Sequence, residues 1–236
     1  MQGCTRYDTV ITMPARHRIK QYTEDGYYHI YNRGVEKRLI FLDEQDYAVF
    51  LSYLKDYLLP KDEVGLQKKL ADPLTSYKER DKILKLLRLN NFADEIALLA
   101  YCLMPNHFHL LVKQKEARSI NKFMKSLATR YTMYFNKKYK RVGNLCQDIY
   151  KAVLVNTDEQ FVYLSAYIHR QAIGKDLVAG QPSSYLNYLG QQKTTWVHPE
   201  EILLLFSKNN PRFSYRAFVE QTDDLSPISA TIIEDF

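Results

Sequence analysis

The amino-acid sequence predicts an α+β protein in which one antiparallel sheet carries helices on one face, a ferredoxin-like layer. The prediction rests first on the order of β-forming and amphipathic segments, which is strand, helix, strand, strand, helix, strand, helix. It rests also on a tight turn between the two central strands, which indicates an antiparallel hairpin. With 236 residues and 46% hydrophobic content, the chain is long enough to bury one substantial core.

The first elements follow from local patterns. Residues 26–34 are rich in tyrosine and end in Asn-Arg-Gly, which predicts a strand closed by a turn. Asp43 is a suitable N-cap for a helix whose apolar residues recur at helical spacing, and Pro60 ends that helix. Residues 61–92 are charged, and we expect a surface excursion there with one helix from Ser76 to Leu89.

The central elements surround a Pro-Asn turn. Residues 96–103 form a short apolar segment, and Pro105-Asn106 separates it from a second strand that continues to Lys113. Ser119 is the expected cap of a long amphipathic helix that reaches Tyr139. Together these segments predict the hairpin and the helix that follows it.

The last core elements are a short strand and a helix. Residues 151–155 predict the fourth strand, and a helix is expected from Asp158 to Ile173 with Gly174 as its stop. Beyond residue 190 the chain is expected to form two short helices, at residues 198–205 and 215–219.

Positive charge is concentrated in one part of the chain. The net charge is +6, yet residues 113–151 contain eleven lysines or arginines and only two acids. Such a block favours a polyanionic partner, whereas the alternative is a lysine-rich helix face in contact with water. Nineteen tyrosines and eleven phenylalanines also offer stacking surfaces for unpaired bases, although most of them must belong to the core.

Several classes of protein are excluded by composition. No apolar run is long enough to span a membrane, and the N-terminal residues 1–20 contain no signal-peptide core. The three cysteines, Cys4, Cys102 and Cys146, are too widely spaced for a disulfide framework or a zinc knuckle. We therefore expect a cytoplasmic protein.

Two histidines lie one residue apart on the second hairpin strand. Because side chains alternate along a strand, His107 and His109 point to one face, while Phe108, Leu110 and Val112 point to the other. Two imidazoles so close together can hold one divalent metal ion. The alternative is a pair of hydrogen-bonded histidines at a sheet edge, and the pair alone does not distinguish the two.

The last core helix presents a stripe of three polar side chains. Tyr163, Tyr167 and Gln171 are four residues apart and share one face. Such a stripe often belongs to a core, but a glutamine carbonyl oxygen also suits a hard cation. Two imidazoles and this oxygen would suit Mg²⁺ or Mn²⁺ acting on a phosphate, and a nearby tyrosine could attack phosphorus.

Five motifs occur in order between residues 24 and 190: residues 26–34, the segment from Met104 to His109, residues 130–143, residues 166–171 and residues 183–190. Together they resemble the single-tyrosine HUH transposases, and most closely the REP-associated tyrosine transposase branch. Within this resemblance His107-Phe108-His109 corresponds to the HUH motif. One departure is Gln171-Ala172, where that branch usually has Asn-Pro and other single-tyrosine transposases have the glutamine.

The resemblance implies an activity and a site. Tyr167 would be the catalytic nucleophile, and His107, His109 and Gln171 would be the ligands of Mg²⁺ or Mn²⁺. The substrate would be single-stranded or hairpin DNA, cleaved and rejoined through a 5′-phosphotyrosine intermediate. His169 points off the Tyr-Gln stripe and is not assigned as a base. Basic residues selected by charge and position are candidates for DNA contacts: Arg33, Lys113, Lys115, Lys122, Arg130 and Lys151.

Two other functions compete with cleavage through tyrosine. A non-cleaving descendant would bind hairpin DNA or RNA, and a metal-dependent hydrolase would use water as its nucleophile and leave no covalent adduct.

A monomer and a homodimer are both compatible with the sequence. The expected domains are a flexible basic lead-in at residues 1–24, a transposase domain at residues 25–190 and a helical C-terminal extension at residues 191–236.

Overall fold

Four strands form one antiparallel sheet in the spatial order β2-β3-β1-β4. The computed structural model describes residues 22–173, 180–221 and 226–229. Most of the expected lead-in and the expected helix stop at Gly174 lie outside these residues. The strands are β1 (Tyr27–Arg33), β2 (Ile96–Met104), β3 (His107–Gln114) and β4 (Lys151–Val155). Every neighbouring pair is antiparallel, and this order confirms the ferredoxin-like α+β class.

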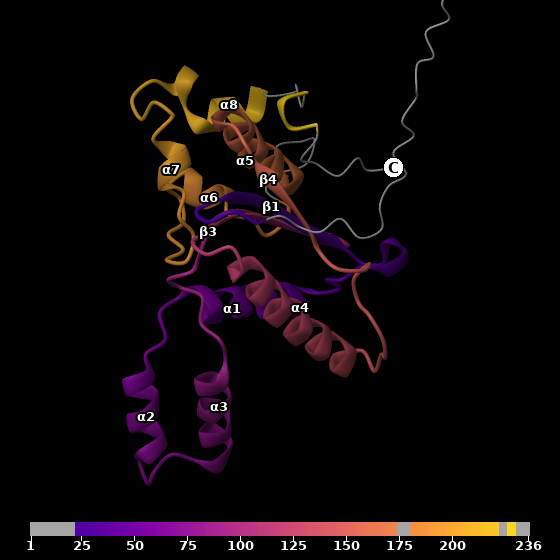
Figure 1. Ribbon diagram of the computed structural model, residues 1–236, viewed down its shortest axis with the longest axis vertical. Helices are drawn as coiled ribbons and strands as arrows, with labels where there is room; N and C mark the ends of the chain where they lie inside the picture. Colours follow the sequence, from indigo (N-terminus) through magenta and orange to yellow (C-terminus); the bar gives the residue numbers. More distant parts are fainter. Residues whose placement is uncertain (1–21, 174–179, 222–225, 230–236) are drawn as a thin grey trace, which may run out of the picture.

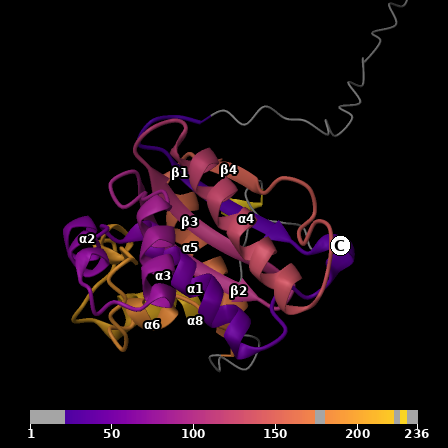
Figure 2. The ribbon, with the colours of Figure 1, turned by 90° about the horizontal axis from the view of Figure 1, so that it is seen from below.

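One face of the sheet is covered by α1 (Glu44–Leu58) and α4 (Ser119–Lys138). The apolar stripes of both helices pack on the strand residues that point toward them, among them Phe108, Leu110 and Val112 of β3. Seen from below, α1 and α4 lie in front of the strands (Figure 2). This layer is the one expected from the sequence.

The opposite face is covered as well, which differs from the expectation of helices on one face. The elements on that side are α5 (Asp158–Ile173), α6 (Tyr185–Tyr188), α7 (Glu200–Leu203) and α8 (Tyr215–Gln221), which lie above the sheet in Figure 1. The physical reason is that the central strands are apolar on both sides: Leu110 and Leu111 point to opposite faces and both are fully buried. Leu111 and Leu99 form a second core with Ile168 of α5.

The described part of the C-terminal extension joins this second core. Tyr215 and Val219 of α8 are buried there together with Ile228. The shorter helical turns are η1 (Val35–Lys37), η2 (Pro211–Phe213) and η3 (Ser226–Ile228). The described residues of the extension therefore pack against α5, while the three expected domain boundaries stay predictions.

The charged excursion forms an arm of two helices, α2 (Glu63–Ala71) and α3 (Tyr77–Arg88). The sequence predicted the second helix and its N-cap Ser76, whose side chain accepts a hydrogen bond from Glu79 N, but not the first helix. The two helices pack against each other and project away from the sheet (Figure 1). The arm extends on the side of α1 and α4.

Capping agrees with the sequence at α1 and differs at α4. Asp43 accepts a hydrogen bond from Asp46 N and begins α1 as expected. Ser119 is instead the first residue inside α4, and its hydroxyl donates to Glu95 at 2.7 Å. Ser119 thus ties the start of α4 to the segment that leads into β2.

Candidate active site

The two histidines of β3 lie together on the face that α5 covers. His107 and His109 are both buried, and their ring centroids are 4.9 Å apart with the planes at 89°. Phe108, between them, packs in the opposite core with α1 and α4. The strand alternation predicted from the sequence therefore holds at this pair.

Each imidazole uses its Nδ1 to bond a neighbouring side chain. Nδ1 of His107 lies 2.6 Å from Oδ1 of Asn106, and Nδ1 of His109 lies 2.9 Å from Nε2 of His29. An imidazole that donates from Nδ1 carries its lone pair on Nε2, the atom through which it can bind a metal. Nε2 of His109 is buried and has no hydrogen-bond partner among the described residues.

Burial keeps His109 neutral. It holds the pKa of His109 well below the usual histidine range, and the nearby His29, His107 and Arg33 lower it further. A neutral imidazole is the form that binds a metal ion. The electrostatic surroundings of His109 therefore suit a metal ligand.

Tyr167 lies over the histidine pair. Its ring centroid is 5.5 Å from that of His109, with the planes at 84°, and the side chain is 6% exposed. Helix α5 brings it there by packing on β2 and β3 through Leu164, Ala166 and Ile168. The tyrosine and the histidine pair, far apart in the sequence, therefore form one site.

Gln171 lies one helical turn beyond Tyr167 on α5 and is partly buried. The described residues contain no group of three or more His, Cys, Asp or Glu side chains able to hold a metal. A third protein ligand beside the two histidines would therefore come from another residue type, and the Gln171 amide oxygen has the right chemistry. The donor set of two imidazoles and one amide fits a divalent cation.

Cys102 lies opposite His109 on β2 and faces the same core. Burial raises the pKa of its thiol to about 12. Because the thiolate is the form that binds metals, Cys102 is a packing residue here. It does not replace Gln171 in the candidate site.

His169 has a structural role, in agreement with its exclusion as a base. Its Nδ1 lies 2.6 Å from the Tyr215 hydroxyl and its Nε2 lies 2.7 Å from the Ser184 hydroxyl. The side chain is fully buried, and burial lowers its pKa to about 3. His169 thus joins α5 to the C-terminal elements.

Sequence reasoning missed His29. Its signal is the alternation of Tyr27, His29 and Tyr31 along β1, which places all three on the face opposite Tyr28 and Ile30. The alternation could not show that His29 meets His109, because that contact depends on the register of β1 against β3. In that register Tyr31 is the direct partner of His109.

Two of the six candidate DNA-contact residues lie beside the site. Arg33 is the register partner of His107 on β1 and is partly buried. Lys151 is exposed on the edge strand β4, and its ammonium lies 5.9 Å from the ring centroid of Tyr31. Both cations are therefore positioned near the His107–His109 pair.

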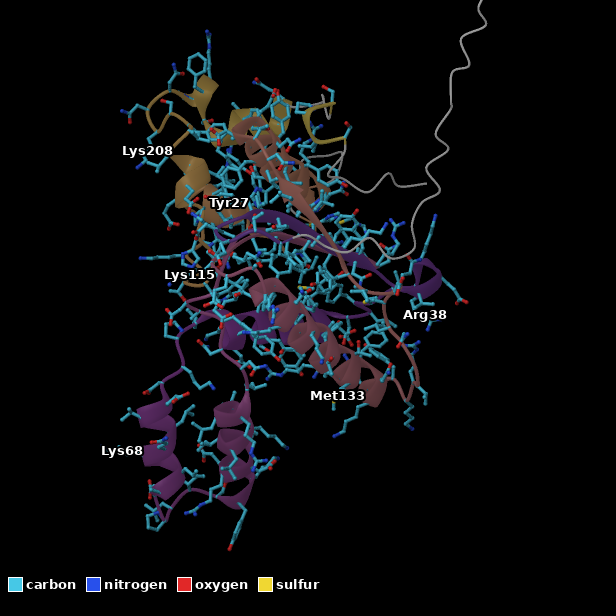
Figure 3. All side chains as sticks on the ribbon, viewed as in Figure 1. Tyr27, Arg38, Lys68, Lys115, Met133 and Lys208 are labelled. Carbon is cyan, nitrogen blue, oxygen red and sulfur yellow. The ribbon has the colours of Figure 1, made fainter. Side chains whose placement is uncertain are left out.

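The other four candidates lie away from the site. Lys113 is about 20 Å along β3 from His107 and pairs with Glu201 at 3.1 Å. Lys115 is exposed just after β3 (Figure 3). Lys122 and Arg130 belong to α4 on the opposite face.

Arg130 is held by α1. Its guanidinium pairs with Asp56 at 2.8 Å and lies 3.7 Å from the ring centroid of Tyr53. Lys138 is likewise bonded to Asp43 and Asp46 of α1 and its cap. Part of the basic block predicted to meet a polyanion thus joins α4 to α1.

Comparisons with known proteins match one segment of the chain to a family. Residues 71–171 match the model of the family described as transposase IS200-like, a segment that contains His107, His109 and Tyr167 and ends at Gln171. Over this segment the match agrees with the family that the ordered motifs indicated. A comparison with curated proteins found no match. None of the helices in the described ranges is both long and apolar enough to cross a membrane.

Among solved structures, one described as "Structure of the REP associates tyrosine transposase bound to a REP hairpin" is similar to this chain. The two have 10% sequence identity and a TM-score of 0.43. The similarity covers 84% of this chain and 98% of that one.

Proposed function

We propose that this protein is an IS200-like transposase, in keeping with the match over residues 71–171, and that it cleaves and rejoins single-stranded DNA through a 5′-phosphotyrosine at Tyr167. The substrate class is hairpin-forming repeat DNA. The observation that carries the proposal is the position of the Tyr167 ring 5.5 Å from that of His109, in a buried site beside two cations. A DNA substrate also accords with a cytoplasmic location.

His107, His109 and Gln171 would hold Mg²⁺ or Mn²⁺. The fit rests on the buried Nε2 atom of His109 and on the oxygen that Gln171 adds to the nitrogens of the two imidazoles. When bound, the metal would supply Lewis acidity that polarises a non-bridging oxygen of the scissile phosphate. The hydrogen bonds that join His107 to Asn106 and His109 to His29 would hold the two imidazoles in orientation when no metal is bound.

The Tyr167 hydroxyl supplies the nucleophile. Its oxygen loses the phenolic proton and forms a bond to phosphorus while the bond from phosphorus to the 3′ oxygen breaks. The leaving oxygen takes up a proton, so the step consumes and releases one proton each. The products are a 5′-phosphotyrosine and a free 3′-hydroxyl. That hydroxyl, or one from another strand, reverses the step and joins DNA without ATP because the phosphotyrosine bond retains the energy of the broken bond.

Arg33 and Lys151 are the basic residues best placed to bind the DNA backbone at the site. Arg33 ends β1 opposite His107, and Lys151 begins β4 beside Tyr31. Such contacts position phosphates and carry little sequence information. Lys115 is exposed at the other end of the sheet, where it could contact a longer strand.

The deciding experiment is covalent capture. Protein is incubated with Mn²⁺ and a labelled single strand that contains a hairpin, and adducts are separated on a denaturing gel. Tyr167→Phe should abolish the adduct while hairpin binding persists. Tyr163→Phe is the matched control, because Tyr163 is one turn earlier on α5 and packs on Phe218 instead of the histidines; its adduct should form normally.

The same assay separates the competing functions. Cleavage without an adduct would favour a hydrolase with water as its nucleophile, and hairpin binding without cleavage would favour a non-cleaving descendant. Adduct formation by Tyr167→Phe would exclude the proposed nucleophile. Equal cleavage of a blunt duplex would contradict the single-stranded substrate.

A further inference from the structure

His29 on β1 directly contacts the candidate metal ligand His109. Its Nε2 lies 2.9 Å from Nδ1 of His109, and the two rings stack with centroids 5.1 Å apart and planes at 19°. Both side chains are buried, at 0% and 1% exposure. The segment that matches the transposase family begins at residue 71, so β1 and His29 lie outside it.

The hydrogen bond between the two imidazoles couples their tautomers. At a distance of 2.9 Å one nitrogen donates and the other accepts. If Nδ1 of His109 donates, its lone pair is on Nε2. Nε2 of His109 is buried without a hydrogen-bond partner among the described residues. In the other tautomer of His109 the proton would be on Nε2, which would leave a buried N–H group without an acceptor and would cost free energy.

The surroundings of His29 hold its ring in place. Strand β1 is hydrogen-bonded on both sides, to β3 and to β4. The ring of Tyr31 lies 4.8 Å away by centroid, and the ring of Tyr167 lies edge-on at 6.4 Å. His29 is therefore a buried imidazole with a fixed orientation on a central strand, and its Nε2 lies within hydrogen-bond distance of His109.

We propose that His29 is a positioning residue, which accepts the Nδ1–H of His109 and so keeps Nε2 of His109 unprotonated and aimed into the site. The metal-binding part of this inference rests on the proposed function. The tautomer part does not, because it concerns the protein without a metal. For His107 the neighbouring acceptor is Oδ1 of Asn106, which lies in the turn between β2 and β3 and not on a strand.

The test uses two variants of the full chain and two measurements. His29→Phe keeps a ring of similar size and removes the acceptor, whereas His29→Gln replaces Nε2 by an amide oxygen at a similar reach. The tautomer of His109 is read from histidine ¹⁵N chemical shifts without metal. The Mn²⁺ dissociation constant is then measured by calorimetry.

The expected results form one pattern. In the wild type, His109 should carry its proton on Nδ1. His29→Phe should mix the tautomers and weaken Mn²⁺ binding by about 10-fold to 100-fold, and His29→Gln should restore most of both. His169→Phe is the matched control: His169 is equally buried but bonds Tyr215 and Ser184, so its loss should lower stability without changing the His109 tautomer.

Three results would overturn parts of the inference in distinguishable ways. A wild-type His109 protonated on Nε2 would overturn it outright. An unchanged tautomer and a Mn²⁺ affinity within twofold in His29→Phe would show that His29 only fills space, even if cleavage through Tyr167 is established. Failure of the wild type to bind Mn²⁺, with the Nδ1–H tautomer present, would refute the metal site and with it the role of His29 in metal binding.

Discussion

The ring of Tyr167 stands edge-on to the ring of His109, with the centroids 5.5 Å apart and the planes at 84°. The two residues come from α5 and β3, which belong to opposite layers of one core. A proposed nucleophile and a proposed metal ligand thus lie in contact before any DNA arrives. The geometry leads to five further predictions about ligands, DNA contacts, stability and its dependence on pH.

The first prediction concerns the histidine pair. Replacing His107 and His109 by alanine should lower metal-dependent adduct formation by about 100-fold or more, because the two nitrogen ligands are removed. Adduct yield against Mn²⁺ concentration is the measurement. Hairpin affinity and the unfolding midpoint serve as controls for folding. Full activity in the double variant would refute the metal assignment.

The second prediction concerns Gln171. Gln171→Ala should weaken Mn²⁺ binding by about 10-fold, and Gln171→Glu should retain an oxygen ligand and bind at least as tightly as the wild type. Calorimetry measures both. Gln160→Ala is the control, because Gln160 lies on the first turns of α5 and accepts a hydrogen bond from Asn156 N. Equal affinities for wild type and Gln171→Ala would remove Gln171 from the site.

The third prediction concerns the exposed cation beside the site. Lys151→Ala should weaken hairpin binding about fivefold at 0.1 M salt and reduce the slope of log affinity against log salt by about 0.7 to 1. Fluorescence anisotropy at several salt concentrations measures both quantities. Lys68→Ala is the control, because Lys68 is an exposed lysine on the α2–α3 arm, far from the site (Figure 3). The same loss in both variants would mean that binding depends on net charge alone.

The fourth prediction concerns Asp46, a fully buried carboxylate at the start of α1. It accepts hydrogen bonds from Lys138 at 2.8 Å, Tyr134 at 2.9 Å and Tyr139 at 2.8 Å. Asp46→Ala should therefore lower the free energy of unfolding by about 3 kcal/mol, because it removes the buried acceptor that these three donors share. Lys138 and Tyr139 keep their bonds to Asp43, so the loss comes mainly from Tyr134 and from the Leu42 amide. Urea denaturation measures the loss.

The same carboxylate predicts a dependence of stability on pH. Burial by itself would raise the pKa of Asp46, but the hydrogen bonds from Lys138, from the Leu42 amide and from the two tyrosines outweigh burial and lower it. A carboxyl whose pKa is lower in the folded state stabilises the fold above its unfolded pKa, which is near 4. This contribution should be lost as the pH falls from about 4 toward the folded pKa. An Asp46→Asn variant that keeps the full acid sensitivity would contradict the assignment.

Local patterns predicted the main elements because their causes are local. Hydrophobic period, turn residues and caps lie within a few positions of one another, so the strands, the Pro105-Asn106 turn and the Asp43 cap could be recognised in the sequence. Strand alternation similarly placed His107 and His109 on one face. Helical spacing placed Tyr167 and Gln171 on one stripe, and the ordered motifs indicated the family whose model matches residues 71–171.

The contacts between residues far apart in the sequence could not be predicted from local patterns, because they depend on the tertiary structure. That His29 bonds His109 follows from the register of β1 against β3, and register is set by how whole strands pair and bury their apolar faces. Nothing in the sequence singles out Asp56 as the partner of Arg130, since other acids are nearer along the chain. The pair forms because α1 and α4 pack together. Residue types and spacing thus predicted the chemistry proposed for the site. The neighbours that orient His109, and the cations that remain near it, follow from the tertiary fold.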